Sequence, residues 1–305
     1  MRSGTPSGSA SSSPKYCVFG SPQAVAKAAV LSALKLGYRH IDTAEFYANE
    51  AGVGRALAAS GVARESVFIT SKLNPGNPNW GQTVKTYETT IEACKESVRK
   101  LGVDKIDLYL VHTPFSGKEA RIEQWRALVH AKELGLARSI GVSHYCKRHI
   151  DDILEVATVT PAINQVQFHV GMGAASPGGG ANATDDREYD GTVGVTYQSF
   201  SPLCGPCEGS DHMELITGDL VTKIGKAHGK SGAQVALKWQ VQQGMARLLP
   251  TAVACSFFLK AHLPLRRPSL HECVSPGHSS SKVFPPSSES ARTTQRNAAH
   301  RSSSS

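Results

Sequence analysis

The sequence predicts an α/β protein with a parallel sheet, of a length that suits one βα barrel with short tails. Short apolar runs alternate with helical patterns from about residue 21 to residue 250, and this alternation indicates parallel strands joined by helices. No Gly-x-Gly-x-x-Gly follows any predicted strand, which argues against a Rossmann fold. The 305 residues are enough for one large barrel domain.

The predicted elements begin with a reduced first strand at 16–20. The first helix is expected to start at Ser21-Pro22, because Pro is favoured at the first helical position, and to end at Gly37. His40-Ile41 forms the next strand. The further strands are expected at 67–71, 106–111, 138–142, 163–168, 193–199 and 246–250, and further helices at 83–101, 122–134, 147–156, 218–228 and 231–244.

Four helices carry more specific expectations. The helix at 83–101 has apolar residues at three–four spacing, as in a stripe that faces a sheet. Gly52-x-Gly54 lies inside the second helix and indicates close packing. A glycine-rich segment at 171–180 is expected to break the sixth helix. In the helix at 231–244, the residues predicted to be buried are Val235, Ala236 and Trp239.

Four polar side chains fall at the C-terminal ends of consecutive predicted strands, where βα barrels build their active sites: Asp42, Tyr47, Lys72 and His112. The pKa of a free phenol is about 10, which is too high for an efficient acid at neutral pH, and a nearby ammonium lowers it. Asp42 would keep Lys72 charged and oriented. His112 would hydrogen-bond the oxygen of a bound carbonyl, and Tyr47 would protonate the alkoxide as it forms.

Each of these residues also has a purely structural interpretation. Tyr47 fits a surface aromatic, and His112 fits a core histidine with satisfied hydrogen bonds. Asp42 and Lys72 fit a structural ion pair. For one residue alone the structural interpretation is favoured. Four such residues at matching strand ends favour a proton-handling site.

Several motifs, in order and spacing, are those of one enzyme family. They are Gly37-Tyr-Arg-His-Ile-Asp-Thr-Ala44 with Tyr47, Ser71-Lys72, Leu108-Tyr-Leu-Val-His-Thr-Pro114, Ser139-Ile-Gly-Val-Ser143, Asn164-Gln-Val-Gln-Phe168, Ser201-Pro-Leu203 and Ala233-Gln-Val-Ala-Leu-Lys-Trp239. On these motifs the chain closely resembles the aldo-keto reductases over about residues 20–250. The resemblance implies a (β/α)8 TIM barrel, here incomplete at its first strand and last helix. It also implies NADPH-dependent reduction of an aldehyde or ketone.

The resemblance further implies roles for single residues. Asp42, Tyr47, Lys72 and His112 would form the catalytic tetrad, with Tyr47 as the acid. The positions that would hold NADP are Asp42, Ser143, His144, Gln165, Phe200, Ser201 and Leu203. Among these, Ser143 and Gln165 would hold the nicotinamide carboxamide. Two positions depart from the family: Phe200 replaces a stacking Tyr, and His144 replaces an Asn, which is expected to weaken nicotinamide binding.

The resemblance ends shortly after Pro250. The family continues with Lys-Ser and a later Arg that hold the 2′-phosphate of NADP, but here Thr251-Ala252 follows. Residues 253–305 contain thirteen Ser and no helical period, so they are expected to form a disordered, basic tail that lacks the family's last helix. Residues 1–15 are also expected to be disordered, or less plausibly a transit peptide. The barrel is expected at 16–252.

Composition excludes several other classes of function. Of the net charge of +8, residues 253–305 hold seven Lys/Arg against two Asp/Glu, and Arg2 and Lys15 add two more charges, so the barrel carries only +1. A nearly neutral body does not predict nucleic-acid binding. No apolar run is long enough to span a membrane. Seven Cys without disulfide-framework spacing indicate a reducing compartment. We therefore expect a cytoplasmic monomer that acts on a small carbonyl substrate.

Two other functions stay open. Cys204-Gly-Pro-Cys207 has the spacing of a redox pair, but the Glu-Gly-Ser-Asp that follows indicates a loop rather than the helix such a pair requires. A non-catalytic barrel that senses a cofactor or acts as a regulatory subunit is the stronger alternative. The intact tetrad favours the enzyme, whereas the lost phosphate site and last helix favour this alternative.

Overall fold

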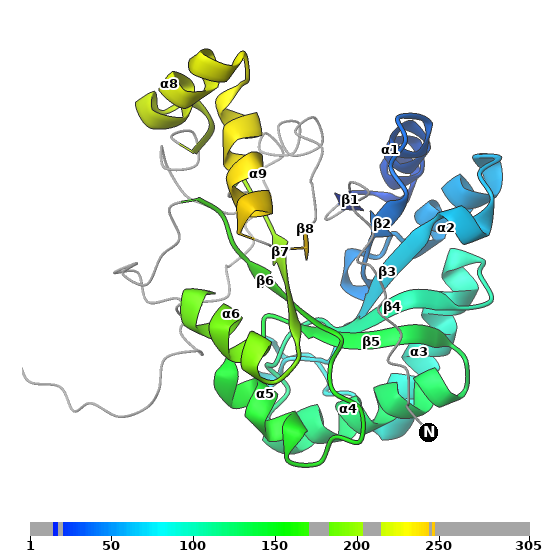
Figure 1. Cartoon of the computed structure of the whole chain (residues 1–305). Helices are drawn as coiled ribbons and strands as arrows, with labels where there is room; N and C mark the ends of the chain where they lie inside the picture. The colour runs from blue at the N-terminus through cyan, green and yellow to red at the C-terminus, as the bar shows by residue number, and fades with distance from the viewer. Residues whose placement is uncertain (1–14, 18–20, 171–182, 204–214, 244–245, 248–305) are drawn as a thin grey trace, which may run out of the picture. The chain divides into compact units, whose positions relative to one another are not determined.

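The computed structural model describes residues 15–17, 21–170, 183–203, 215–243 and 246–247. Its centre is a parallel sheet of eight strands in the order β1-β2-β3-β4-β5-β6-β7-β8, so each strand pairs with its neighbours in sequence (Figure 1). The strands are β1 Lys15–Cys17, β2 His40–Asp42, β3 Phe68–Leu73, β4 Ile106–Val111, β5 Ala137–Ser143, β6 Ile163–Gln167, β7 Thr196–Phe200 and β8 Ala246–Arg247. This order is that of a βα barrel.

Helices connect the strands. The α-helices are α1 Gln23–Lys35, α2 Glu50–Ala59, α3 Tyr87–Leu101, α4 Lys118–Glu133, α5 Lys147–Leu154, α6 Ala183–Thr192, α8 Asp219–His228 and α9 Gly232–Gln242. Three short 3₁₀ helices are η1 Glu45–Tyr47, η2 Arg64–Ser66 and η3 Pro78–Trp80. From α1 to α5, each helix packs against the next one along the chain (Figure 1). The predicted alternation of strand and helix is thus confirmed.

The predicted incompleteness is visible at both ends of the sheet. β1 has three residues and β8 has two. Within the described part of the chain, no strand pairing joins β8 to β1. β1 begins at Lys15, one residue before the predicted start of the barrel. Residues 1–14 and 248–305, which include Pro250 and the predicted tail, lie outside the described residues, as do Cys204 and Cys207.

Three predicted helix starts were wrong. α4 begins at Lys118 rather than near residue 122. α3 begins at Tyr87 rather than near residue 83, because the Thr86 side chain accepts a hydrogen bond from the backbone N–H of Thr89 and caps the helix. α1 begins at Gln23, with Pro22 at the N-cap position and no capping bond from a side chain. The predicted end of α1 is confirmed, since Gly37 adopts a left-handed φ of 93°.

The glycine-rich segment predicted to break the sixth helix lies outside the described residues. α6 forms at Ala183–Thr192, after this segment. In α9 the predicted buried face was partly wrong: Ala236 is buried, but Trp239 and Val235 are only half-buried. Another fully buried residue on this side of α9 is Gln240. Its side-chain amide donates hydrogen bonds to backbone carbonyls at the ends of β6 and β7.

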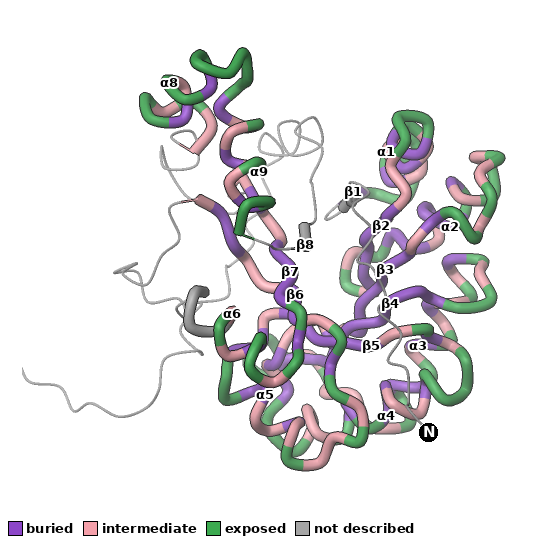
Figure 2. The backbone as a smooth tube through the Cα atoms, viewed as in Figure 1, coloured by how far each residue is buried: buried purple, intermediate pink, exposed green. Residues whose placement is uncertain are grey.

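The main hydrophobic core lies between β2–β5 and helices α1–α5, where Figure 2 shows the strands as buried along most of their length. Its large, fully buried side chains include Ile41, Tyr109 and Trp125. A second, smaller cluster joins Phe168 of the β6 end and Tyr197 of β7 to Trp239 of α9. The strands that carry Asp42 and Lys72 therefore stand in the well-packed part of the protein.

The two glycines of α2 confirm the predicted close packing. A Cβ at Gly52 would lie 2.3 Å from the Gln23 carbonyl oxygen of α1. A Cβ at Gly54 would lie 2.6 Å from the backbone oxygens of Leu101 and Lys100 at the end of α3. Both neighbours are backbone atoms, which cannot rotate away. Glycine therefore allows α2 to contact α1 and α3 at backbone distance.

We predict that Gly52→Ala destabilises the protein by about 1–3 kcal/mol in urea unfolding, because the added methyl group overpacks the contact between α1 and α2. Helix propensity alone would stabilise the variant by about 1 kcal/mol. The matched control is Gly191→Ala in α6, where an added Cβ meets nothing within 4 Å. Equal effects of the two substitutions would contradict the packing argument.

Candidate functional site

The candidate site is built from residues on four neighbouring elements. Asp42 ends β2, Lys72 lies near the end of β3, and His112 follows directly after β4. Tyr47 is the last residue of η1, which begins three residues beyond β2. The backbone N–H of His112 donates to the Leu73 carbonyl at 3.1 Å, which extends the β3–β4 ladder to the site. Consecutive parallel strands thus bring these side chains to one edge of the sheet.

Lys72 and Asp42 form a buried ion pair. Their side chains are 1% and 0% exposed, and Lys72 Nζ donates to Asp42 Oδ1. The ammonium also donates to the Thr43 carbonyl at 2.9 Å. Asp42 Oδ2 accepts a hydrogen bond from Gln165 Nε2 at 3.0 Å, so both oxygens of the carboxylate are engaged. A buried charge is tolerated only when it is paired in this way.

The Tyr47 side chain lies near both this ammonium and an imidazole. Lys72 Nζ is 5.2 Å from the centroid of the Tyr47 ring. The hydroxyl is 3.5 Å from His112 Nε2, at the outer limit of a hydrogen bond, and the two rings meet edge-on. Tyr47 and His112 are both half-buried, whereas Asp42 and Lys72 are fully buried. The two groups suited to contact a substrate are therefore the two that are partly open.

Two histidines stand side by side at the site. The His144 ring lies 6.3 Å from the His112 ring and 4.8 Å from the Phe200 ring, measured between centroids. Burial, and after it the charge of Lys72, lowers the pKa of His144 to about 4. The same two causes, with His144 as a third, lower the pKa of His112 well below its ordinary value. Both imidazoles are therefore neutral near pH 7.

The remaining predicted cofactor residues surround His144. Ser143 Oγ donates to the Gln165 carbonyl at 2.7 Å, and both residues are buried. The His144 backbone N–H donates to the same carbonyl at 2.9 Å, which ties the end of β5 to β6. Ser201 has a left-handed φ of 47° and, like Phe200 and Leu203, is only half-buried. The end of β7 thus stays partly accessible next to His144.

One residue of this network was missed from the sequence. Gln198 on β7 is buried and accepts a hydrogen bond from Gln165 Nε2 at 2.8 Å. Its signal was a long polar side chain inside the predicted strand 193–199, beside the apolar Tyr197. A single polar residue in a strand is usually solvent-facing. Only the structure shows that Gln198 points into the barrel toward Gln165.

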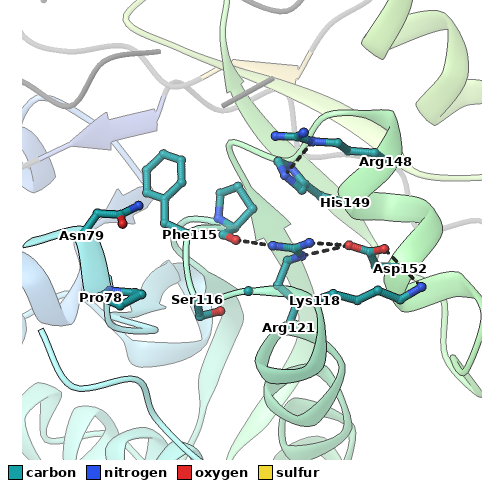
Figure 3. Close-up of a pocket in the computed structure, with 11 residues that line it drawn as sticks. Pro78, Asn79, Phe115, Ser116, Lys118, Arg121, Arg148, His149 and Asp152 are labelled. Atoms are coloured by element: carbon teal, nitrogen blue, oxygen red, sulfur yellow. Dashed lines mark hydrogen bonds and ion pairs between the residues drawn. The ribbon is translucent and has the colours of Figure 1, made fainter. Parts of the chain in front are cut away.

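A groove of about 500 Å³ lies beside the site, between the chain segments that follow β3 and β4 and the first turns of α4 and α5. Arg121 donates to the Pro114 carbonyl at 2.6 Å, and Figure 3 shows its guanidinium reaching Asp152. Arg148 lies against His149, whose Nε2 is 3.2 Å from Arg148 Nε. None of the predicted site residues lines this groove.

Other kinds of site find no support in the described ranges. No group of three or more His, Cys, Asp or Glu is placed to hold a metal ion there. Across the same ranges, no helix is both long enough and apolar enough to cross a bilayer. Cys94 and Cys146 are buried and do not form a disulfide.

Comparison with known proteins identifies the family. The model of the Aldo/keto reductase family matches residues 17–179. The glyoxal reductase of Bacillus subtilis (strain 168) is 38% identical over 219 residues, which are 72% of this chain and 70% of that protein. The chain belongs to the aldo/keto reductase family. The resemblance drawn from the sequence motifs is thereby confirmed, and the family assignment indicates an oxidoreductase that acts on carbonyl compounds.

Solved structures agree with this assignment. The crystal structure of an aldo/keto reductase from Brucella melitensis matches with a TM-score of 0.67 and 33% identity, over 79% of this chain and 84% of that chain. An aldo-keto reductase of Bombyx mori, solved in complex with NADP, matches with a TM-score of 0.61 and 28% identity, over 77% of this chain and 78% of that chain. These likenesses confirm the incomplete (β/α)8 barrel.

The neutral histidines lead to a prediction about stability and pH. The pKa of His144 is about 4 in the folded protein, compared with about 6.5 for a free histidine. The unfolded chain therefore binds more protons in this range, and stability falls as pH drops from about 6.5 toward 4, by at most about 1.4 kcal/mol per pH unit for each such group. We predict that His144→Asn makes this dependence shallower in urea unfolding measured at several pH values.

The control for this measurement is His228→Asn, since the His228 ring is exposed at the end of α8. This variant is expected to keep the pH dependence of the parent protein. An unchanged slope in His144→Asn would mean that this imidazole is solvated in the folded protein and does not face a buried site.

Proposed function

We propose that this protein reduces an aldehyde or ketone to an alcohol with NADPH, and that Tyr47 donates the proton. The observation that carries the proposal is the position of Tyr47. Its hydroxyl is 3.5 Å from the neutral His112, and its ring centroid is 5.2 Å from the buried, paired ammonium of Lys72. This arrangement suits a phenol that must release a proton near neutral pH. The family assignment supports carbonyl reduction in general.

The four residues have different tasks in this mechanism. Asp42 holds Lys72 charged, and Lys72 favours the phenolate that Tyr47 becomes after it has given up its proton. His112 is neutral and carries one N–H, so it orients the carbonyl oxygen as a hydrogen-bond donor and does not compete as an acid. As the alkoxide forms, the hydroxyl proton of Tyr47 moves to its oxygen. A general acid of this kind accelerates a reaction by about 10²–10⁴-fold.

The hydrogen-bonding capacity left at the site fits a nicotinamide carboxamide. Ser143 Oγ uses its proton on the Gln165 carbonyl, so its lone pairs remain as acceptors. Gln165 uses both hydrogens of Nε2 on Asp42 and Gln198, which leaves Oε1 as an acceptor. Neutral His144 offers one N–H as a donor. Two acceptors and one donor complement the NH₂ and C=O of an amide.

These residues, with the Phe200 ring and the half-buried residues Ser201 and Leu203, are those that would hold NADPH. When bound there, the nicotinamide would supply the hydride. The NADP complex of the Bombyx mori relative supports this choice of cofactor. The glyoxal reductase relative supports a small carbonyl substrate.

We predict that Tyr47→Phe lowers kcat by about a hundredfold or more with a generic aromatic aldehyde, because it removes the transferable proton and preserves the shape of the ring. The affinity for NADPH, measured by fluorescence titration, should change little. The matched control is Tyr87→Phe, which removes a hydroxyl that also contacts a histidine, His130 Nδ1 at 2.8 Å, outside the site. It is expected to keep full activity.

A normal rate in Tyr47→Phe would remove this residue from the mechanism. If the parent protein binds NADPH but turns over no aldehyde or ketone, the non-catalytic, cofactor-sensing alternative gains support instead.

A second prediction concerns the choice of cofactor. Thr251-Ala252 replaces the family's Lys-Ser after Pro250, so the 2′-phosphate lacks charge-assisted partners worth about 1.5–3 kcal/mol each. We therefore expect NADPH and NADH to bind with similar affinity in parallel fluorescence titrations. A strong preference for NADPH would show that another cation, such as Lys260 or Arg266, takes over this contact.

A further inference from the structure

Two buried glutamines connect β7 to the buried ion pair. Gln165 on β6 donates one hydrogen of Nε2 to Asp42 Oδ2 at 3.0 Å and the other to Gln198 Oε1 at 2.8 Å. Gln165 is 3% exposed and Gln198 is 2% exposed. Asp42 in turn accepts from Lys72 Nζ. The four side chains form one continuous chain of contacts from β7, through β6 and β2, to β3.

The charge of Asp42 fixes the direction of every hydrogen bond in this chain. An ionised carboxylate only accepts, so Gln165 must turn its NH₂ group, and not its oxygen, toward Asp42. The second hydrogen of that NH₂ group then needs an acceptor, which Gln198 supplies with its own oxygen. A buried N–H left without an acceptor is destabilising, because it has lost its hydrogen bonds to water and gained none in the protein. Gln198 therefore stabilises the orientation of the Gln165 amide that Asp42 requires.

We propose that Gln198 is a positioning residue for the proton donor: through Gln165 and Asp42 it holds the Lys72 ammonium beside Tyr47. This inference rests on the proposed function, in which Tyr47 is that donor. Without the Gln198 oxygen the Gln165 amide is free to rotate, Asp42 Oδ2 loses its donor, and the carboxylate no longer holds Lys72 in one place. The ammonium then favours the Tyr47 phenolate less.

Within the part of the chain that the structure describes, few charged groups face Tyr47. Lys72 on β3 lies 5.2 Å from the ring centroid, and His112 after β4 lies 3.5 Å from the hydroxyl. Asp42 on β2 acts through Lys72, and Glu45 on η1 is turned to Lys85 at 3.0 Å. His144 stands behind His112 and is neutral near pH 7. Displacement of Lys72 is therefore the change that the Tyr47 titration reports.

The test is the titration of Tyr47 itself, which requires neither turnover nor bound cofactor. The protein has eight tyrosines. The tyrosinate absorbance of the parent protein minus that of Tyr47→Phe isolates the titration of Tyr47, over the alkaline range in which circular dichroism shows the fold intact. In the same way, the absorbance of Gln198→Met minus that of the double variant Gln198→Met/Tyr47→Phe isolates the Tyr47 titration without the Gln198 oxygen. We expect the midpoint of this titration to be higher than in the parent protein by roughly half a pH unit, which is about threefold in the ionisation constant.

A matched control separates positioning from loss of a buried hydrogen bond. Gln124 on α4 is also fully buried, and its side chain makes three hydrogen bonds, to Pro75 O, Lys85 O and Ser116 Oγ, compared with the one that Gln198 makes to Gln165. Gln124→Met should therefore lower stability at least as much as Gln198→Met and leave the Tyr47 midpoint in place. If Gln198→Met does not fold, Gln198→Asn serves instead, because it keeps the amide but is one methylene too short to reach Gln165.

A double-mutant cycle identifies the route of the effect. If Gln198 acts through Asp42, the substitution Gln198→Met should add no shift of the Tyr47 midpoint in an Asp42→Asn background. An equal shift in both backgrounds, or no shift in either, overturns the proposal. Failure of the parent protein to reduce any carbonyl would reject the proposed function, but the titration would still decide whether Gln198 positions Lys72 beside Tyr47.

Discussion

The buried ion pair between Lys72 and Asp42 is the constraint on which the site depends. Moving two charges out of water costs several kcal/mol for each ion, and only close pairing with further hydrogen bonds offsets this cost. The strand register provides the pairing. Asp42 lies opposite Thr70 in the β2–β3 ladder, and Lys72, two residues further on, points to the same side of the sheet as Thr70. Two short strands thus place opposite charges within reach.

The second oxygen of Asp42 finds its hydrogen-bond donor only because the sheet is curved. The second oxygen of Asp42 accepts from Gln165, yet β2 and β6 are four positions apart in the sheet order. Neighbouring strands are about 4.8 Å apart, so a flat sheet would separate these residues by about 19 Å. The contact of 3.0 Å exists only because the sheet is curved, so that inward-pointing side chains of β2 and β6 approach each other. One buried carboxylate is therefore satisfied by barrel geometry even though the two outermost strands are short.

The sequence predicted the parts of this arrangement that depend on local pattern. Asp42, Lys72 and His112 follow apolar runs, and parallel topology brings such positions together. The amides that complete the site were harder to predict, because their partners lie far away in sequence. Gln198 and Gln165 are separated by 33 residues in the sequence, and Gln165 and Asp42 by 123 residues. Likewise, Gln240 is buried in place of Trp239 because its amide finds three partners at the ends of β6 and β7.

Electrostatics explains why two histidines can stand in a site built around a lysine. Lys72 already has Asp42 as its counter-ion, so a second cation beside it would be buried without a partner. His112 and His144 avoid this by staying neutral, and burial together with Lys72 lowers the pKa of each. A neutral imidazole keeps one donor and one acceptor, so these residues can orient a ligand without adding charge. The single ammonium is then left to act on Tyr47 alone. Protonation of either histidine in acid would repel the Lys72 ammonium that acts on Tyr47. It would also remove a hydrogen-bond acceptor that can orient a ligand.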